Sequence, residues 1–428
     1  MNEKLQIVFG LLGGLAIFLY GMNMMSECLQ KAAGEKMKTI LALLTKNPIL
    51  GVLAGALTTA VLQSSSATTV MAIGFVSAGL MNLPQAISII FGANIGTTMT
   101  AQIIAFKISD YIYIIIFVGF IIAFIAKSEK AKSIGQTIFA FGLLFLGIET
   151  MGDVMKPLAS SPMFTQLIAS VKHIPVLGVG VGTLMTLVVQ SSSATIAVLQ
   201  NFAAQAGPDG MTSILGLTGA IPILLGDNIG TTITALLASI GQSKDAKRTA
   251  VAHCIFNISG CFLFIWFVKP FAALIQYISP KGPEIEVISR QIANAHTVFN
   301  ITMTLICLIN VMVKIVMMLI PDGKSKEIDP ARPLYLDEKI ISQPTAALQL
   351  VAKEILHLSD MVKEAVKDTI SIVKTEETSR MNALTEKGHQ IKTLADRITE
   401  YLALLFSSGT MTEQQASQTA SLMYVLSD

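Results

Sequence analysis

Residues 63–68 read Gln-Ser-Ser-Ser-Ala-Thr, and residues 190–195 repeat the same six letters. A second echo follows each copy: residues 92–98 read Gly-Ala-Asn-Ile-Gly-Thr-Thr, and residues 226–232 read Gly-Asp-Asn-Ile-Gly-Thr-Thr. We call the first pair the serine motifs and the second pair the asparagine motifs. A lone serine run in an apolar helix is usually a packing feature. Two matched copies instead favour a binding site, because polar groups deep in apolar sequence are costly unless they bind something or one another.

The composition places the chain in a membrane. Of its 428 residues, 52% are hydrophobic and only 14% are charged, whereas a soluble domain has about 25% charged residues. Several runs of about 20 apolar residues indicate membrane spans, and the first apolar run is too long for a cleavable signal peptide. The net charge of +2 indicates no nucleic-acid partner. The four scattered cysteines form no Cys-x-x-Cys pair and are interpreted as core residues.

Each serine motif joins two short apolar pieces. Residues 48–62 would rise only about 22 Å as a helix, which is short of the hydrocarbon core of about 30 Å. Residues 67–80 form a second short piece after the motif, and residues 175–189 and 194–206 repeat this arrangement. Two half-length pieces joined at a polar motif predict a re-entrant hairpin whose tip lies near the middle of the membrane.

The asparagine motifs lie inside longer apolar runs. Residues 84–106 and 211–240 are long enough to cross the membrane, and we expect the glycine-rich stretches at 92–96 and 226–230 to interrupt them. The other expected spans are residues 5–25, 111–126, 134–151, 249–268 and 288–320. The last two share an Ala-His-x-x-Phe-Asn echo that contains His253 and His296. We interpret these histidines as hydrogen-bonding between helices, with a role in transport as the alternative.

An odd number of crossings in the first unit, three plus one hairpin, would turn the second unit upside down. This is the inverted-repeat plan of secondary transporters. We therefore expect an all-α polytopic membrane protein with two inverted-topology repeats, re-entrant helical hairpins and broken helices, followed by a soluble helical C-terminal domain. The expected domains are the first transmembrane repeat (1–133), the second (134–268), a final transmembrane helix with its preceding connection (269–321), a linker (322–344) and the C-terminal domain (345–428).

The distribution of basic residues suggests the orientation. If the C-terminus is cytoplasmic, the loops on that side carry ten Lys and Arg, and the loops on the other side carry six. This agrees with the positive-inside rule and places the N-terminus outside. The inner loops would be residues 26–47, 127–133 and 242–248, and the outer loops 107–110, 153–174, 207–210 and 269–290.

The chemistry of the motifs suits a small anion together with a cation. Hydroxyl and amide groups both donate and accept hydrogen bonds. A helix that starts just after each serine motif would direct free N–H groups and its positive dipole end at the motif, which favours a compact anion such as phosphate. Neither kind of motif contains Lys or Arg. Because a bare multivalent anion is costly in a low-dielectric site, we expect Na⁺ to bind beside it.

These considerations select the candidate site residues. Asp227 is open to three interpretations, as a cation ligand, a proton site or a structural hydrogen bonder, because the first half has Ala93 in its place. The candidates for phosphate are Gln63, Ser64, Ser65, Ser66, Gln190, Ser191, Ser192, Ser193, Asn94 and Asn228. The candidates for Na⁺ are Ser66, Thr68, Thr97, Thr98, Ser193, Thr195, Asp227, Thr231 and Thr232. No transition metal is expected.

At these residues the chain resembles the type II sodium-dependent phosphate cotransporter family in its bacterial form. The hallmark of that family is a duplicated Gln-Ser-Ser-Ser motif in inverted repeats, which stands here at residues 63–66 and 190–193. The resemblance covers roughly residues 5–320. It implies a symporter, not an enzyme, in the cell (inner) membrane, which moves inorganic phosphate by alternating access with Na⁺ as the coupling ion and no other cofactor. The C-terminal stretch is similar to a partial, cytoplasmic PhoU-like regulator domain.

Other functions stay open at this point. A phosphate-responsive membrane sensor would bind phosphate without flux, and a phosphate exporter would use the same site in the opposite direction. An intramembrane serine hydrolase is the more remote alternative, since it needs one nucleophile with a positioned base and the chain lacks the Gly-x-Ser-x-Gly turn. The expected partners are phosphate, Na⁺ and the lipid bilayer, with a second copy of the chain or a regulatory protein at the C-terminal domain.

Overall fold

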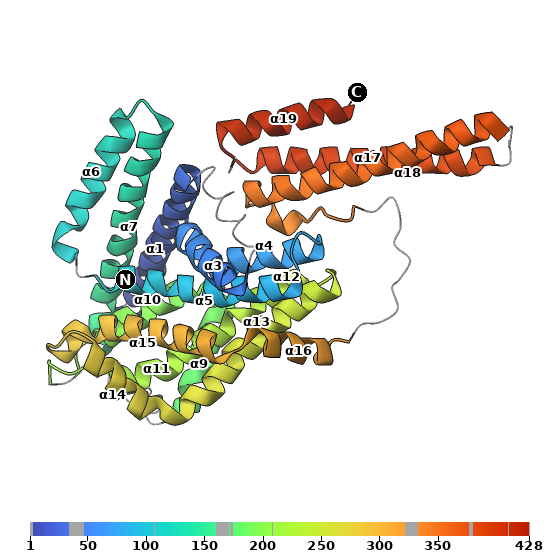
Figure 1. Cartoon of the computed structure of the whole chain (residues 1–428). Helices are drawn as coiled ribbons and strands as arrows, with labels where there is room; N and C mark the ends of the chain where they lie inside the picture. Colours follow the sequence, from blue (N-terminus) through green and yellow to red (C-terminus); the bar gives the residue numbers. More distant parts are fainter. Residues whose placement is uncertain are drawn as a thin grey trace.

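The computed structural model is built from helices (Figure 1). It describes residues 3–33, 47–106, 108–159, 171, 174–207, 209–321, 333–375, 380–409 and 411–427. Five of the described helices are long and apolar enough to cross a membrane, or six if one bent pair counts as a single span. The expectation of an all-α polytopic membrane protein is confirmed.

The two repeats have matching helices. The first contains α1 (Glu3–Ala33), α3 (Pro48–Leu62), α4 (Ser65–Ser77), α5 (Leu83–Ile104), η1 (Ser109–Tyr111) and α6 (Ile112–Ile125). The second contains α7 (Glu129–Ala159), α9 (Pro175–Val189), α10 (Ser192–Ala203), α11 (Gly216–Gly230), α12 (Thr232–Ser239), α13 (Lys244–Phe264), η2 (Ile265–Phe267) and α14 (Val268–Ile278). The remaining helices are α15 (Glu284–Ile306), α16 (Ile309–Leu319), η3 (Glu338–Ile340), α17 (Pro344–Thr375), α18 (Met381–Ser407) and α19 (Glu413–Ser427).

The glycines of the asparagine motifs bring two helices into backbone contact. A Cβ at Gly92 on α5 would overlap the Val52 carbonyl oxygen on α3, and a Cβ at Gly226 on α11 would overlap the Val179 carbonyl oxygen on α9. The predicted interruption at 92–96 is wrong, because α5 is continuous through it. The glycines permit close helix packing without breaking the helical hydrogen bonds. In the second repeat the break falls at Thr231, directly after the glycine stretch.

The two hairpins open toward opposite ends of α5. The Ser243 N–H donates a 3.1 Å hydrogen bond to Ser77 Oγ, so the end of α4 lies beside the end of α12, and α5 starts soon afterwards. Gln200 Nε2 donates a 3.1 Å bond to the Ala101 carbonyl, so the end of α10 lies near the far end of α5. The hairpin arms α4 and α10 thus run in opposite senses along α5, as expected for inverted repeats.

The final predicted span is bent. The span expected over residues 288–320 is formed by α15 and α16, which make an angle of 76° with each other. The chain leaves helical geometry at Cys307, where ψ is 88°, and α16 then starts after Leu308. α16 ends beside the start of α13, because the Arg248 guanidinium binds the Ile320 carbonyl.

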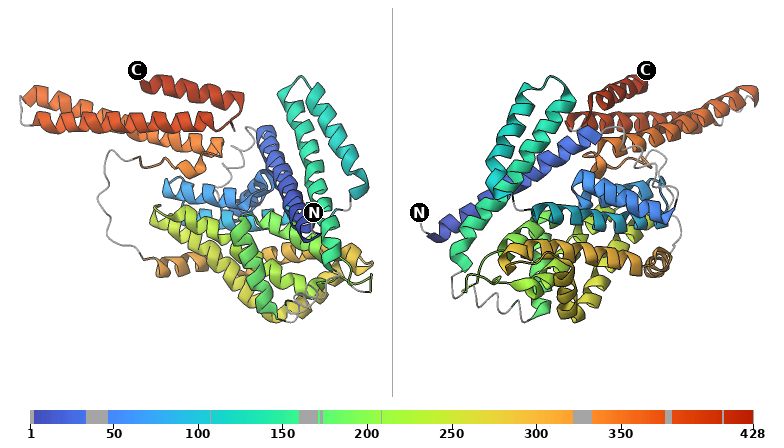
Figure 2. Two further views of the ribbon diagram at one scale, coloured as in Figure 1. Left: turned by 180° about the vertical axis from the view of Figure 1, so that it is seen from behind. Right: turned by 60° about the vertical axis from the view of Figure 1, so that its left-hand side comes forward.

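The C-terminal helices lie together, on the side of the membrane helices where α4 is found (Figures 1 and 2). The helical character expected for residues 345–428 is confirmed over the described part, where α17 and α18 pair along their length. Of the expected linker 322–344, residues 322–332 lie outside the described residues. Residues 333–343 form a structured segment around η3.

Candidate functional site

The tip of each hairpin is a glutamine in a left-handed backbone conformation. Gln63 ends α3 with φ 51° and ψ 25°, and Gln190 ends α9 with φ 54° and ψ 25°. These are the two non-glycine residues with positive φ in the described part of the chain. Glycine is the usual residue at such a helix end, and another residue there costs about 1–2 kcal/mol. A glutamine at both tips therefore indicates a role for the side chain.

The serine that follows each glutamine starts the second arm. Ser64 and Ser191 are N-caps whose hydroxyl oxygens accept hydrogen bonds from the N–H groups of Ala67 and Ala194, both at 3.2 Å. Each motif thus ends one helix and caps the next within two residues, which explains how the chain reverses there. The free N–H groups of the first turn and the positive dipole end are left at the tip. Ser65, Ser192 and Ser193 are buried in these first turns.

A hydrogen bond between two threonines joins the arms of each hairpin. The hydroxyl oxygens of Thr59 and Thr68 lie 2.9 Å apart, and those of Thr186 and Thr195 lie 3.0 Å apart. All four side chains are buried. Thr68 and Thr195 were predicted as site residues, whereas Thr59 and Thr186 were missed. The signal in the sequence was a threonine four residues before each glutamine.

The asparagine motifs are joined to the two histidines. His253 Nε2 lies 3.1 Å from Asn94 Oδ1, and His296 Nε2 lies 3.2 Å from Asn228 Oδ1. Both histidines are buried, and both Nδ1 atoms have no partner among the described residues. Hydrogen bonding between helices, the main interpretation for these histidines, is confirmed. A serine hydrolase would instead need a histidine facing one of the serines.

Asp227 of the second asparagine motif stands where the first motif has Ala93. Its side chain is completely buried, and Oδ1 accepts a 2.6 Å hydrogen bond from the Thr186 hydroxyl. Oδ2 has no partner in the described part of the chain. A buried carboxylate oxygen without a partner is costly, and a cation would compensate for it.

The threonines of the asparagine motifs, which were also predicted as Na⁺ ligands, bond to their own helices. Thr97 Oγ1 donates to the Ala93 carbonyl and Thr231 Oγ1 to the Asp227 carbonyl, each at 3.0 Å. Thr98 and Thr232 donate in the same way to the carbonyls of the third residue before them. A hydroxyl whose proton is used in this way presents only lone pairs to its surroundings, which suits a cation ligand.

The comparison with known proteins identifies the family. Residues 17–153 and 151–279 each match the Na⁺/Pi-cotransporter family. The chain belongs to the Na⁺/Pi-cotransporter family. The family accounts for the two repeats, since each match covers one hairpin together with its asparagine motif. Phosphate transport across a membrane is the activity of this family.

Individual relatives extend this result. An uncharacterized protein of Bacillus subtilis, YqeW, is 31% identical over 72% of this chain and 96% of its own length. A candidate inorganic phosphate export protein of Salmonella typhimurium, YjbB, is 25% identical over 92% of this chain and 70% of its own length. Sodium-dependent phosphate transport protein 2A of Rattus norvegicus is 37% identical over 24% of this chain and 17% of its own length. No solved structure matches the chain.

In this Na⁺/Pi-cotransporter family member the two hairpin tips have different surroundings. Gln63 is buried, and its Oε1 accepts a 3.1 Å bond from Thr100 on α5. Gln190 is exposed. One contact between the repeats joins Ser66 of the first motif to Thr234 on α12, whose hydroxyl oxygens lie 3.2 Å apart. Thr100 and Thr234 occupy corresponding places in the repeats, and the sequence prediction missed both.

Proposed function

We propose that the chain is a Na⁺-coupled symporter that moves inorganic phosphate by alternating access. The observation that carries the Na⁺ part is the buried Asp227 carboxylate, with one oxygen bound by Thr186 and the other without a partner in the described part of the chain. Na⁺ at this position would neutralise the carboxylate and lie among the hydroxyl oxygens of neighbouring threonines. The other candidate Na⁺ ligands are the threonines of both motifs together with Ser66 and Ser193.

Phosphate binding is assigned to the two hairpin tips. The start of α4 after Gln63 and the start of α10 after Gln190 each offer backbone N–H groups and serine hydroxyls. Such donors bind phosphate through hydrogen bonds. Asn94 and Asn228 complete the proposed set, each held in place by its histidine. Because the charge of phosphate is not balanced by lysine or arginine in the motifs, its binding should depend on Na⁺.

We further propose that the protein lies in the cell (inner) membrane with the C-terminal helices in the cytoplasm. The distribution of Lys and Arg between the loops supports this orientation. A PhoU-like character of α17, α18 and α19 remains a proposal, as does a second copy of the chain or a regulatory protein as their partner. No cofactor other than Na⁺ is proposed.

Export is the second candidate function, because a relative matched over 92% of this chain is named for inorganic phosphate export. A symporter runs in the direction set by its gradients. Each charge that moves down a potential of 100 mV supplies about 2.3 kcal/mol, so one or two Na⁺ ions would suffice to drive concentration of phosphate.

The test is radiolabelled phosphate flux in proteoliposomes containing the purified full chain. We expect an inward Na⁺ gradient to accelerate uptake and an outward gradient to accelerate efflux, with K⁺ gradients of equal size as the control. Flux that does not respond to Na⁺ would rule out coupling. Saturable phosphate binding without flux would favour the sensor alternative.

A further inference from the structure

Residues 333–343, here called the docking segment, bind the end of α12 in the second repeat. The Lys339 ammonium donates to the carbonyl oxygens of Leu237, Ala238 and Ile240 at 3.2, 2.8 and 3.2 Å. These carbonyls lie at the C-terminal end of α12, which carries the negative end of the helix dipole. The Leu237 carbonyl also accepts from the Ile240 N–H. Next to them, Gln242 Nε2 donates a 3.1 Å bond to Asp337 Oδ2.

The same segment binds α4 in the first repeat. Ile340 is fully buried, and its Cδ1 packs directly on the backbone of Gly74, where any side chain would collide with it. Gln343 is also buried, and its Nε2 donates a 2.7 Å bond to the carbonyl oxygen of Ala67. Ala67 directly follows Ser66 of the first serine motif. The segment therefore reaches from the C-terminal helices to the proposed phosphate site.

The first C-terminal helix, α17, binds both the end of α4 and the docking segment. Lys353 Nζ donates to the carbonyls of Ala78 and Gly79 at the end of α4, at 3.1 and 3.0 Å. The fully buried Glu354 accepts hydrogen bonds from the N–H groups of Tyr335 and Leu336. Two lysines, Lys339 and Lys353, thus hold the C-terminal ends of two helices that belong to different repeats.

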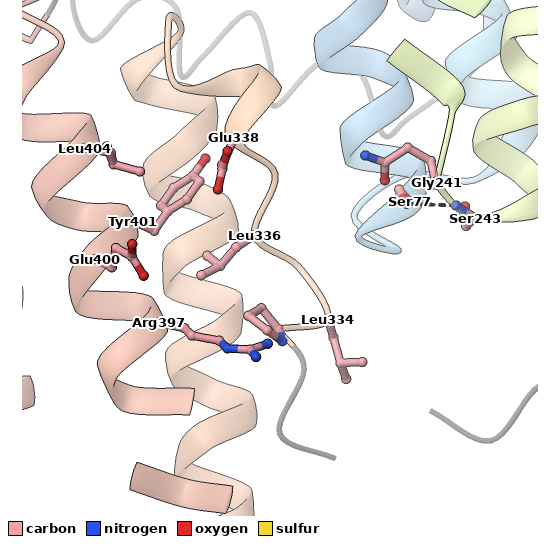
Figure 3. Close-up of a pocket in the computed structure, with 12 residues that line it drawn as sticks. Ser77, Gly241, Ser243, Leu334, Leu336, Glu338, Arg397, Glu400, Tyr401 and Leu404 are labelled. Carbon is pink, nitrogen blue, oxygen red and sulfur yellow. Dashed lines mark hydrogen bonds between the residues drawn. The ribbon is translucent and has the colours of Figure 1, made fainter. Parts of the chain in front are cut away.

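A cavity lies between the docking segment and the ends of α4 and α12. It has a volume of about 730 Å³ and is lined by the segment, by α18 and by the turn between α12 and α13. In Figure 3, Leu336 and Glu338 of the segment lie near Tyr401, while Ser77 and Ser243 lie across the cavity. Glu338 and Lys339 are exposed. The cavity thus leaves part of the contact between the segment and the ends of α4 and α12 unfilled.

We propose that the docking segment is an autoinhibitory clamp: bound to α4 and α12 together, it holds the two repeats in one relative position and covers the first serine motif from the side of the C-terminal helices. Alternating access requires the repeats to move against each other, so transport requires the segment to leave. This inference rests on the proposed transport function. It assigns to the C-terminal helices the control of one side of the site.

The test combines a labelling assay with the flux assay on the full chain. The four native cysteines, all free thiols, are replaced by alanine, and a single cysteine replaces Val70. This residue packs against the clusters formed by Ile340 on one side and by α12 on the other. The rate at which a membrane-impermeant maleimide labels it reports undocking without requiring any transport.

The variant is Lys339→Ala with Lys353→Ala, which removes both helix-end contacts. The matched control is Lys367→Ala with Lys392→Ala, which removes two exposed lysines of α17 and α18. We expect labelling and initial phosphate flux to rise about tenfold or more in the variant, as expected for the loss of one to two hydrogen bonds from charged groups. The control should match the parent. The second variant is Gln343→Ala, which removes the hydrogen bond to the Ala67 carbonyl.

The outcomes separate the clamp from the transport function. Labelling that stays at the parent rate in the double variant and in Gln343→Ala would overturn the clamp. Faster labelling with equal or slower flux would also overturn it, since the segment would then support the transporter instead of inhibiting it. Faster labelling in chains that show no phosphate flux at all would confirm that the two lysines hold the segment, and it would count against the proposed transport function.

Discussion

The Thr186 hydroxyl donates a 2.6 Å hydrogen bond to Asp227 at the buried centre of the second repeat. The corresponding place in the first repeat is filled by Ala93. There the hydrogen bond described for the Thr59 hydroxyl goes to Thr68 on the other hairpin arm. The repeats therefore share one framework, and the second adds a carboxyl group to it. This difference places the strongest proposed Na⁺ ligand in the second repeat.

Asp227→Asn should weaken the response to Na⁺ more than the affinity for phosphate. The amide keeps the shape and can still accept from Thr186, but it removes the charge that attracts the cation. We expect the Na⁺ concentration for half-maximal flux to rise about tenfold or more, which corresponds to about 1.4 kcal/mol. Asp110→Asn, the same chemical change at an exposed residue of η1, should leave it near the parent value. An unchanged Na⁺ response in Asp227→Asn would remove this residue from the site.

Replacing Gln63 or Gln190 should separate the backbone role of each tip from the role of its side chain. Gln→Gly relieves the left-handed conformation and should stabilise the hairpin by up to about 1 kcal/mol, whereas Gln→Ala keeps the strain. We expect phosphate flux to be lost in both kinds of variant while the folded protein is recovered in normal yield. Flux that survives in the glycine variants would mean that the glutamines only end the helices.

Gly92→Ala and Gly226→Ala should destabilise the protein. Each new Cβ would overlap a backbone carbonyl of the adjacent hairpin arm, and overpacking of this kind costs about 1–3 kcal/mol or more. Gly180→Ala on α9 is the matched control, because nothing lies within 4 Å of its added Cβ, and alanine is the better helix former by about 1 kcal/mol. Thermal unfolding in detergent measures both. Equal thermal unfolding midpoints for Gly226→Ala and Gly180→Ala would show that the contact between α11 and α9 can relax to accept the new Cβ.

The hairpins could be predicted from the sequence because their signals are local. Helices α3 and α9 are both too short to span a membrane and end at the same polar letters. The effect of Gly92 could not be predicted in the same way. A glycine in an apolar run indicates either a helix break or close packing, and the position of α3, set by tertiary contact, decides between them.

The site was predicted only in part for a related reason. The motif residues themselves stand out as polar letters in apolar sequence, and the structure places them at helix ends and buried contacts. Thr100, Thr234 and Gln343 matter through contacts over long sequence separations, such as the 276 positions between Gln343 and Ala67. No periodicity reveals such a partner. The docking segment was accordingly assigned to a polar linker, although it is packed on both repeats.

Acidic pH should strengthen docking of this segment. Burial raises the pKa of the Asp337 carboxyl, an effect that the adjacent Lys339 opposes and Glu338 reinforces. The Tyr401 hydroxyl also lies close, donating to the Asp337 carbonyl. A carboxyl with a raised pKa in the docked state binds its proton more tightly there than when the segment is free. Docking is therefore favoured as the pH falls through the raised pKa toward the ordinary value of about 3.9, and is weakened above it.

Labelling of cysteine at position 70 measures this dependence. The rate is divided by that of a Lys392→Cys chain, because thiol reactivity itself rises with pH. We expect the ratio to fall at acidic pH in the parent and to stay flat in Asp337→Asn, which holds a neutral side chain at every pH. His357, bonded to Glu354 at 2.9 Å, is the same in both chains, so only their difference reports on Asp337. The same pH dependence in both chains would show that Asp337 does not control docking.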